Sequence, residues 1–188
     1  MIIGSVSENI NLEKRVAITP DIIKKYKSLG FEIYLNKDYA SHIGIKDEEY
    51  ETEGANIKSI DEVLSSANAI LQMNILNDES LNKLKKDQTL VGVLNPYLNE
   101  KKLREITLKN INCFSLELLP RITRAQSMDI LSSQANLAGY KAVVDSFSYF
   151  QKAIPMMMTA AGTISAAKVL VVGAGVAGLQ AIATAKRL

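Results

Sequence analysis

Apolar runs alternate with charged, amphipathic stretches along the first 119 residues. Short apolar runs rich in strand-forming residues predict strands at 1–6, 31–35, 69–75, 89–95 and 111–119. Between them, helices of roughly ten residues are predicted by stretches such as DIIKKYKSLG, which ends at Gly30, DESLNKLKK and NEKKLREITLKN. This alternation is typical of parallel βαβ units with helices on both faces of a sheet. The sequence therefore predicts an α/β fold that begins with a flavodoxin-like or Rossmann-like parallel-sheet domain.

Two helix starts carry capping signals. Thr19, Pro20 and Asp21 predict an N-cap, a first helical residue and an acidic group favoured by the helix dipole. Ser59, with Glu62 three residues later, predicts a capping box for the helix IDEVLSSA. The charged segment KDEEYETE predicts a further, solvated helix.

The pattern changes after Pro120. Residues 125–153, AQSMDILSSQANLAGYKAVVDSFSYFQKA, contain few helix breakers and predict one long helix with a candidate irregularity at Gly139. A new sheet is then predicted to begin at KVLVVGAG, residues 168–175. We expect an N-terminal α/β subdomain at 1–124, a connecting helix at 125–154 and the start of a second, Rossmann subdomain at 155–188.

Composition narrows the class of protein without selecting a function. Hydrophobic residues make up 47% of the chain and charged residues 22%, which is typical of a soluble globular protein. The 22 Lys and Arg against 20 Asp and Glu are scattered, so no nucleic-acid partner is indicated. Cys113 lies in an apolar run and is predicted to be a buried structural thiol. The single cysteine, the absence of a signal peptide and the absence of an apolar run near ~20 residues predict a cytoplasmic location.

The chain ends in a glycine motif in a strand–turn–helix context. Gly173, Gly175 and Gly178 match G-x-G-x-x-G, with KVLVV predicted as a buried parallel strand before them and a helix from Val176 after them. Such glycines allow a tight turn, close approach of a pyrophosphate and helix–strand packing. Glycine turns without a nucleotide are the alternative. The next strand and its acidic residue, expected about 20 residues further on, would follow Leu188, so we expect a fragment.

A polar run lies at the start of the predicted long helix. It contains Arg121, Gln126, Asp129 and Ser132, and the last three are spaced to share one helical face. A guanidinium, an amide, a carboxylate and a hydroxyl suit a neutral ligand with donors and acceptors, such as a nicotinamide carboxamide. The alternative is a cluster that only caps the helix, and spacing alone slightly favours it.

Four blocks of the sequence resemble one family. RVAITP (15–20), ELLPRITRAQSMDILSSQANLAGY (117–140), PMMMTAAGT (155–163) and the final KVLVVGAGVAGLQAIATAKRL are similar to the NAD(H)-binding domain I of the alpha subunit of proton-translocating NAD(P) transhydrogenases. The resemblance implies two subdomains with NAD(H) in the cleft between them. This sequence would hold the first subdomain, the connecting helix and the first βα unit of the second.

The resemblance also implies roles for the polar run. Arg121, Asp129 and Ser132 would orient the NAD(H) carboxamide, and Gln126 would reach toward the partner nucleotide, so Gln126 and Asp129 are the candidate catalytic residues. The reaction implied is hydride transfer from NADH to NADP+ on a partner domain, coupled to proton translocation across a membrane. Such a transfer needs positioning of two rings and no acid or base. The remaining predicted cofactor-binding residues are Gly173, Gly175, Val176 and Gly178, and no metal site is predicted.

The partners implied are membrane-spanning and NADP(H)-binding transhydrogenase domains or subunits, together with a second copy in a homodimer. The location implied is peripheral, on the cytoplasmic side of the inner cell membrane.

One alternative function is a non-catalytic docking or dimerisation fragment. Another is an alanine dehydrogenase-like, NAD-dependent oxidoreductase in which Arg15 would hold the substrate carboxylate beside a lysine and a histidine. Asn74 and Asn95 stand where those two are expected, and His42 is expected at the surface or at a helix cap, so this alternative is disfavoured.

Overall fold

The chain forms two compact units, Met1–Leu119 and Pro120–Leu188, in a computed structural model that describes residues 1–188. The first unit is built on a six-stranded sheet with the order β3-β2-β1-β4-β5-β6, and every neighbouring pair is parallel. Its strands are β1 (Ile2–Ser5), β2 (Glu32–Asn36), β3 (Asn56–Lys58), β4 (Ala69–Asn74), β5 (Thr89–Val93) and β6 (Asn112–Ser115). The predicted parallel α/β sheet is confirmed.

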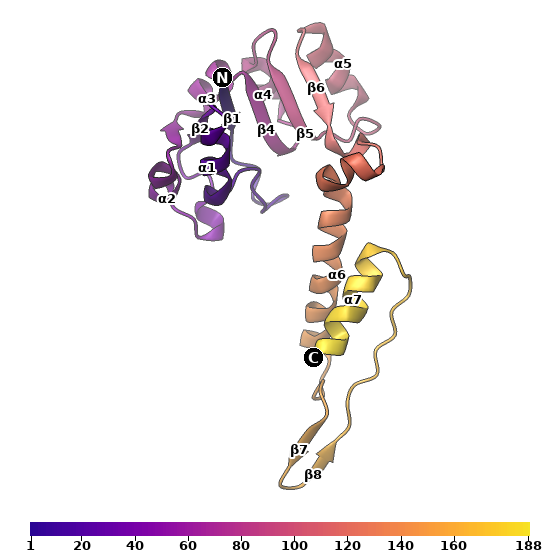
Figure 1. Cartoon of the computed structure of the whole chain (residues 1–188). Helices are drawn as coiled ribbons and strands as arrows, with labels where there is room; N and C mark the ends of the chain where they lie inside the picture. Colours follow the sequence, from indigo (N-terminus) through magenta and orange to yellow (C-terminus); the bar gives the residue numbers. More distant parts are fainter. The chain divides into compact units, whose positions relative to one another are not determined.

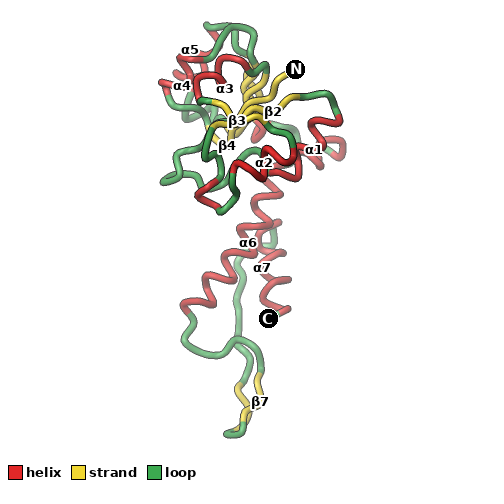
Figure 2. Tube along the Cα trace, turned by 90° about the vertical axis from the view of Figure 1, so that its left-hand side faces the viewer, coloured by secondary structure: helices red, strands yellow, loops and turns green.

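Helices cover both faces of this sheet, as Figure 2 shows. Helices α1 (Pro20–Ser28) and α2 (Asp47–Glu53) lie on one face. On the other face lie α3 (Ile60–Ser66), α4 (Asp78–Lys83) and α5 (Glu100–Leu108). Two short 3₁₀ turns, η1 (Ser41–Ile43) and η2 (Leu116–Leu118), complete the unit.

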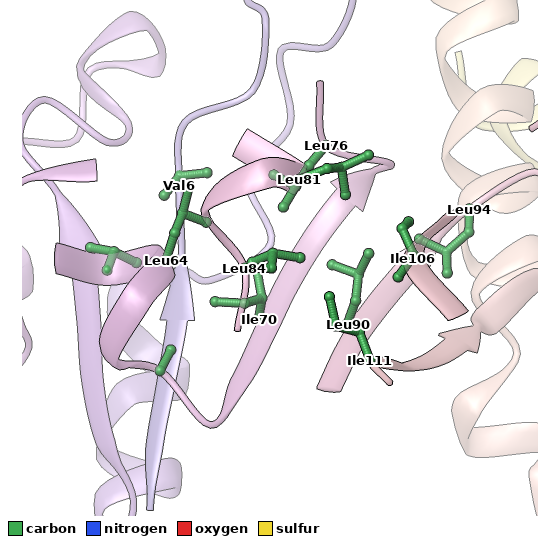
Figure 3. Packing of buried hydrophobic residues seen from close by; sticks show 12 residues of the cluster. Val6, Leu64, Ile70, Leu76, Leu81, Leu84, Leu90, Leu94, Ile106 and Ile111 are labelled. Atoms are coloured by element: carbon green, nitrogen blue, oxygen red, sulfur yellow. The ribbon is translucent and has the colours of Figure 1, made fainter. Parts of the chain in front are cut away.

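Two apolar clusters separate the helices from the sheet. The cluster under α3, α4 and α5 contains Leu64, Ile70, Leu90, Leu94 and Ile106, which Figure 3 shows converging from helices and strands. The cluster under α1 and α2 contains Ile18, Ile23, Ile33, Leu35, Tyr39 and Tyr50. Because both faces of the central strands are covered, these strands are near-continuous apolar runs, which is what made them predictable. Cys113 is half-buried against the first cluster, and burial raises the pKa of its thiol, as expected for a structural cysteine.

The two predicted helix starts differ in detail. Ser59 Oγ accepts a hydrogen bond from the Glu62 N–H at 3.2 Å, and Glu62 Oε2 accepts one from the Ser59 N–H at 3.0 Å, so the capping box is confirmed. Thr19 occupies the N-cap of α1, followed by Pro20 at the first helical position, but the Thr19 side chain makes no capping bond. Helix α1 therefore depends more on its buried face than on its cap.

Ser59→Ala should lower the free energy of unfolding of the first unit by about 1 kcal/mol, since it removes one half of the capping box. Urea unfolding followed by circular dichroism measures this change. Ser65→Ala, in the same helix but away from the cap, is the control and should be neutral or slightly stabilising. Equal unfolding midpoints for the two variants would contradict the assigned role of the cap.

The second unit consists of a 3₁₀ turn, two helices and a hairpin (Figure 1). The turn η3 (Thr123–Met128) precedes α6 (Ile130–Tyr149), strands β7 (Met157–Thr159) and β8 (Gly162–Ile164) pair antiparallel, and α7 (Val176–Arg187) packs along α6. The long helix therefore begins at Ile130 and not at residue 125, because Asp129, with φ −75° and ψ 87°, is its N-cap. The prediction that Gln126, Asp129 and Ser132 share one helical face is wrong, since Gln126 lies in the preceding 3₁₀ turn.

Helix α6 runs without interruption through Gly139, so the candidate irregularity there is absent. Gly139 is buried, and a Cβ atom added to it would collide with the carbonyl oxygen of Ala177 in α7 and lie 2.9 Å from the carbonyl carbon. Val143 and Ala181 are the neighbouring buried residues of the two helices, at 5% and 8% exposure. The glycine is therefore required by close helix–helix approach and not by a kink.

The segment KVLVV, predicted as a buried parallel strand, forms no strand in the second unit. Val169, Leu170 and Val172 are 48%, 88% and 91% exposed. A strand needs a neighbour to pair its backbone groups, and the unit's two strands, β7 and β8, pair with each other. The prediction is therefore wrong for this unit, although helix α7 follows the segment as expected. None of the helices in either unit combines the length and the apolar character that crossing a membrane requires.

Candidate functional site

The glycine turn before α7 has the geometry that its motif predicts. Gly173 has φ 104°, a left-handed conformation that glycine adopts without steric cost. A Cβ atom on Gly178 would collide with the Gly173 carbonyl oxygen, so the third glycine permits the helix to close on the turn. Cβ atoms on Gly173 or Gly175 would meet nothing within 4 Å. The space above the first two glycines is therefore open to a ligand.

The first turn of α7 offers backbone donors to that space. Gly175 is the N-cap and has no side chain to cap the helix. The first intrahelical bond joins the Leu179 N–H to the Gly175 carbonyl at 2.9 Å, so the N–H groups of Val176, Ala177 and Gly178 have no carbonyl partner within the helix. Such N–H groups and the helix dipole favour an anion, and a pyrophosphate fits this donor set.

The polar run of the second unit lines a pocket of about 250 Å³. Its walls come from the two residues before the 3₁₀ turn, the turn itself and the N-cap of α6, and consist of Arg121, Ile122, Thr123, Gln126 and Asp129. Three of the four predicted residues are thus brought together, even though they do not share a helical face. The fourth, Ser132, is joined to the pocket through its bonds to Asp129.

Asp129 is held by Ser132 through two hydrogen bonds. Its Oδ1 accepts from the Ser132 N–H at 2.9 Å, and its Oδ2 accepts from the Ser132 hydroxyl at 2.7 Å. These bonds are the main cause that lowers the pKa of Asp129, and the charge of Arg121 adds to them. The carboxyl group is therefore an ionised acceptor at neutral pH.

The capping role of Asp129 does not exclude a ligand. Two acceptor positions of the carboxylate are used by Ser132, and an ionised carboxylate has about four. Arg121 adds donors, and Gln126 adds both a donor and an acceptor. A carboxamide, which has two N–H donors and one carbonyl acceptor, fits this set of groups.

The first unit has a second pocket, which sequence reasoning missed. The sheet order 3-2-1-4-5-6 reverses between β1 and β4, and ligands of such sheets bind outside the carboxyl ends of the strands at this point. A pocket of about 450 Å³ lies there, lined by Val6, Ser7, Glu8, Asn9, Leu12, Glu13, Gln72, Asn74, Ile75, Leu76, Asn77, Ser80 and Lys102. The available signal was the polar residues at the ends of the predicted strands 1–6 and 69–75, such as Ser7, Glu8 and Asn74. We call this pocket the switch-point pocket.

Arg15, next to this region in sequence, forms an ion pair with Glu13. The Arg15 Nη2 atom lies 2.6 Å from Glu13 Oε2, and Nε lies 2.8 Å from Oε1. These bonds lower the pKa of Glu13 to about 2. Asn74 Nδ2 also donates to Glu13, at 3.3 Å. Arg15 is thus paired with a carboxylate of this chain.

The other groups of an alanine dehydrogenase-like set have structural partners. His42, in η1, lies with Nε2 2.8 Å from the Lys14 carbonyl oxygen, which ties a loop in place. Asn95 adopts φ 46°, and its N–H donates to Glu117. Both residues therefore take part in bonds within the first unit.

The fold and the glycine turn define a doubly wound α/β protein that carries a dinucleotide-type turn. Two family models identify it further: "Alanine dehydrogenase/PNT, N-terminal domain" matches residues 4–138, and "Alanine dehydrogenase/PNT, C-terminal domain" matches residues 142–188. The chain belongs to the alanine dehydrogenase/PNT family, which confirms the resemblance found in the sequence.

Similar proteins indicate the branch of this family. An NAD(P) transhydrogenase alpha-subunit polypeptide from Rickettsia prowazekii is 46% identical over all of this chain and 50% of its own length. The crystal structure of a transhydrogenase from Sinorhizobium meliloti superposes with a TM-score of 0.94 at 43% identity, over all of this chain and 56% of that one. An L-alanine dehydrogenase structure shares the fold, with a TM-score of 0.83 at 19% identity over 52% of its length. The chain thus spans about half the length of the relatives it matches.

Proposed function

We propose that this chain contributes part of the NAD(H)-binding component of a proton-translocating NAD(P) transhydrogenase. The observation that carries the proposal is the pocket lined by Arg121, Gln126 and Asp129, whose donors and acceptors match a carboxamide. The glycine turn, open above Gly173 and Gly175, supports it with a second set of groups suited to the same cofactor. The similarity to transhydrogenase alpha subunits supports the choice of reaction.

Bound NADH would supply the hydride, and the chain would position it. In this proposal Asp129 accepts a hydrogen bond from the carboxamide NH₂ group, Arg121 donates to the carboxamide oxygen, and Ser132 keeps Asp129 ionised and oriented. Gln126 faces the nicotinamide of the acceptor nucleotide. The pyrophosphate lies on the backbone of Gly173, Gly175, Val176 and Gly178. Positioning of this kind can supply much of the rate enhancement of a transfer that needs no acid or base.

The proposal requires other polypeptides or domains. Hydride transfer to NADP+ needs an NADP(H)-binding domain, and coupling to proton translocation needs a membrane-spanning domain. This chain would then lie on the cytoplasmic side of the inner cell membrane as a peripheral component, in a homodimer. Relatives named as a subunit of a transhydrogenase support the need for partner domains or subunits.

In the assembled protein, Arg121→Ala or Asp129→Asn should slow hydride transfer by about tenfold or more, because each removes a group that orients the carboxamide. Stopped-flow absorbance measures the transfer, and NADH fluorescence measures binding, which should persist through the glycine turn. Arg124→Ala is the matched control, since Arg124 is exposed in the same 3₁₀ turn but does not line the pocket. Unchanged transfer in both pocket variants would reduce the cluster to a helix cap.

A second candidate is a non-catalytic docking or dimerisation fragment. The observation in its favour is the apolar segment 169–172, which no strand of the second unit covers. This candidate would replace the first if the assembled transhydrogenase transferred hydride at the wild-type rate with both Arg121 and Asp129 replaced.

A further inference from the structure

Ile122 is the apolar part of the pocket that is proposed to hold the nicotinamide. The other residues that line this pocket, Arg121, Thr123, Gln126 and Asp129, all carry polar or charged side chains. Ligand pockets combine an apolar contact surface with a few polar groups that fix the orientation of the ligand. The proposed function gives Arg121, Gln126 and Asp129 polar roles at the nucleotides and leaves Ile122 without a role.

Ile122 takes no part in the buried core of the second unit. It is 54% exposed, whereas Ala125 is 5% exposed and is the buried residue of the 3₁₀ turn η3. Single exposed apolar residues are ordinary at protein surfaces. The exposure is informative here because Ile122 also lines the pocket, so its apolar surface is available to a ligand there.

Two backbone hydrogen bonds fix the position of Ile122. Its N–H donates to the Pro120 carbonyl oxygen at 3.0 Å, and its carbonyl oxygen accepts from the Ala125 N–H at 2.9 Å. The backbone at Ile122 is extended, with φ −118° and ψ 160°, and the β-branched side chain is restricted to few rotamers. The residue is therefore ordered before a ligand binds, which lowers the entropic cost of binding.

Hydride transfer requires that the two faces of the donor ring have different surroundings. The hydrogen leaves NADH with both bonding electrons and joins the nicotinamide of NADP+, so one nucleotide is oxidised and the other is reduced. One face of the donor ring must therefore be open to the acceptor nucleotide, and the opposite face can lie against the protein. An apolar side chain suits this second face, because it makes van der Waals contact without competing for the hydrogen bonds of the carboxamide.

We propose that the Ile122 side chain packs against the face of the NADH nicotinamide ring that points away from the acceptor nucleotide. This inference rests on the proposed transhydrogenase function. Arg121 and Asp129 would fix the direction of the carboxamide, and Ile122 would fix the distance of the ring from the acceptor. Loss of this contact should therefore reduce both the rate of hydride transfer and the affinity for NADH.

Ile122→Val and Ile122→Thr test the contact with two side chains of nearly the same shape. In the assembled transhydrogenase, Ile122→Thr should transfer hydride about tenfold more slowly than Ile122→Val, because its hydroxyl places a polar group against the ring. Its affinity for NADH should fall by a similar factor. Stopped-flow absorbance measures the transfer, and NADH fluorescence measures the affinity. Both replacements are β-branched and lie at an exposed position, so their effects on folding should be alike.

ADP-ribose, which lacks the nicotinamide ring, distinguishes contact with the ring from a general change of the site. Its affinity should be equal in the two Ile122 variants, since they differ only where the ring is proposed to lie. Met128→Thr is the matched control, because Met128 is 52% exposed at the end of the same 3₁₀ turn and does not line the pocket. This control should transfer hydride at the wild-type rate.

Equal transfer rates in Ile122→Val and Ile122→Thr would overturn the inference. A parallel loss of ADP-ribose binding in Ile122→Thr would also overturn it, since the change would then not be specific to the ring. If Arg121→Ala and Asp129→Asn still slowed transfer in that case, the proposed function would stand without the Ile122 contact. A wild-type assembly that transferred no hydride would overturn both.

Discussion

Gly139→Val is expected to separate α6 from α7 and to destabilise the second unit by about 3 kcal/mol, at the upper end of typical overpacking costs. The added Cβ would collide with the Ala177 carbonyl oxygen, a backbone atom that cannot rotate away. Valine has a higher intrinsic helix propensity than glycine, so propensity offsets this loss only slightly, by less than about 1 kcal/mol. Separation would expose Val143 and Ala181, which are among the few buried residues of this unit.

Amide hydrogen exchange measured along α7 tests this prediction, because the first unit does not contribute to those signals. Exchange at Ala181 and Thr184, both buried on the α6 side of the unit's packing, should accelerate strongly in the variant. Ala138→Val is the matched control, since it places the same side chain on an exposed position of the same helix. If both variants exchange at the same rate, the close approach at Gly139 does not limit the stability of the unit.

The role of Gly139 could not be predicted from the sequence pattern alone. A glycine within a helical pattern indicates either an irregularity of the helix or a close packing contact. The neighbouring residues in the sequence do not distinguish these two possibilities. The deciding atom is the Ala177 carbonyl, 38 residues away along the chain. Strand β3 was missed for a related reason: Asn56–Lys58 is too short for its alternation to be recognised, and its pairing with β2 makes it a strand.

The sequence predicted which residues line the candidate site, but not how the backbone arranges them. Arg121, Gln126 and Asp129 line one pocket as the predicted ligand would require, yet their spacing wrongly indicated one helical face. Asp129 takes ψ 87° and starts the helix itself, because its side chain caps the Ser132 N–H. Three-residue spacing fits both a helical face and a cap with its N3 residue, so the period alone could not distinguish them.

The glycine turn was predicted in more detail because its requirements are local. Gly173 needs a positive φ and Gly178 needs contact with the Gly173 carbonyl, and both conditions lie within six residues of chain. The preceding segment 168–172 was predicted wrongly, since burial of a strand depends on neighbours that its own letters do not contain. Features that depend on nearby residues could therefore be predicted from the sequence, whereas features that depend on distant packing partners could not.

The hydrogen bonds beneath the switch-point pocket depend on residues that are distant in the sequence. The Tyr39 hydroxyl accepts from the Ala17 and Ile18 N–H groups at 3.1 and 3.2 Å, and it lies 2.8 Å from Ser5 Oγ. Ser5 in turn donates to Gln72 Oε1 at 3.0 Å, so the single hydroxyl hydrogen of Tyr39 must point to Ser5. This chain of bonds ties the RVAITP segment to β1 and β4.

Tyr39→Phe should therefore lower the free energy of unfolding of the first unit by about 2–4 kcal/mol. It leaves the Ala17 and Ile18 N–H groups and the Ser5 hydroxyl short of a partner at a position where Tyr39 is only 1% exposed, and each unsatisfied group costs about 1–3 kcal/mol. Urea unfolding measures the loss, and amide exchange at Ala17 and Ile18 localises it. Tyr97→Phe, at a residue that is 88% exposed, is the control and should change stability by less than about 0.5 kcal/mol. A Tyr39→Phe variant as stable as this control would show that water replaces the hydroxyl, and that the RVAITP segment is held by apolar packing alone.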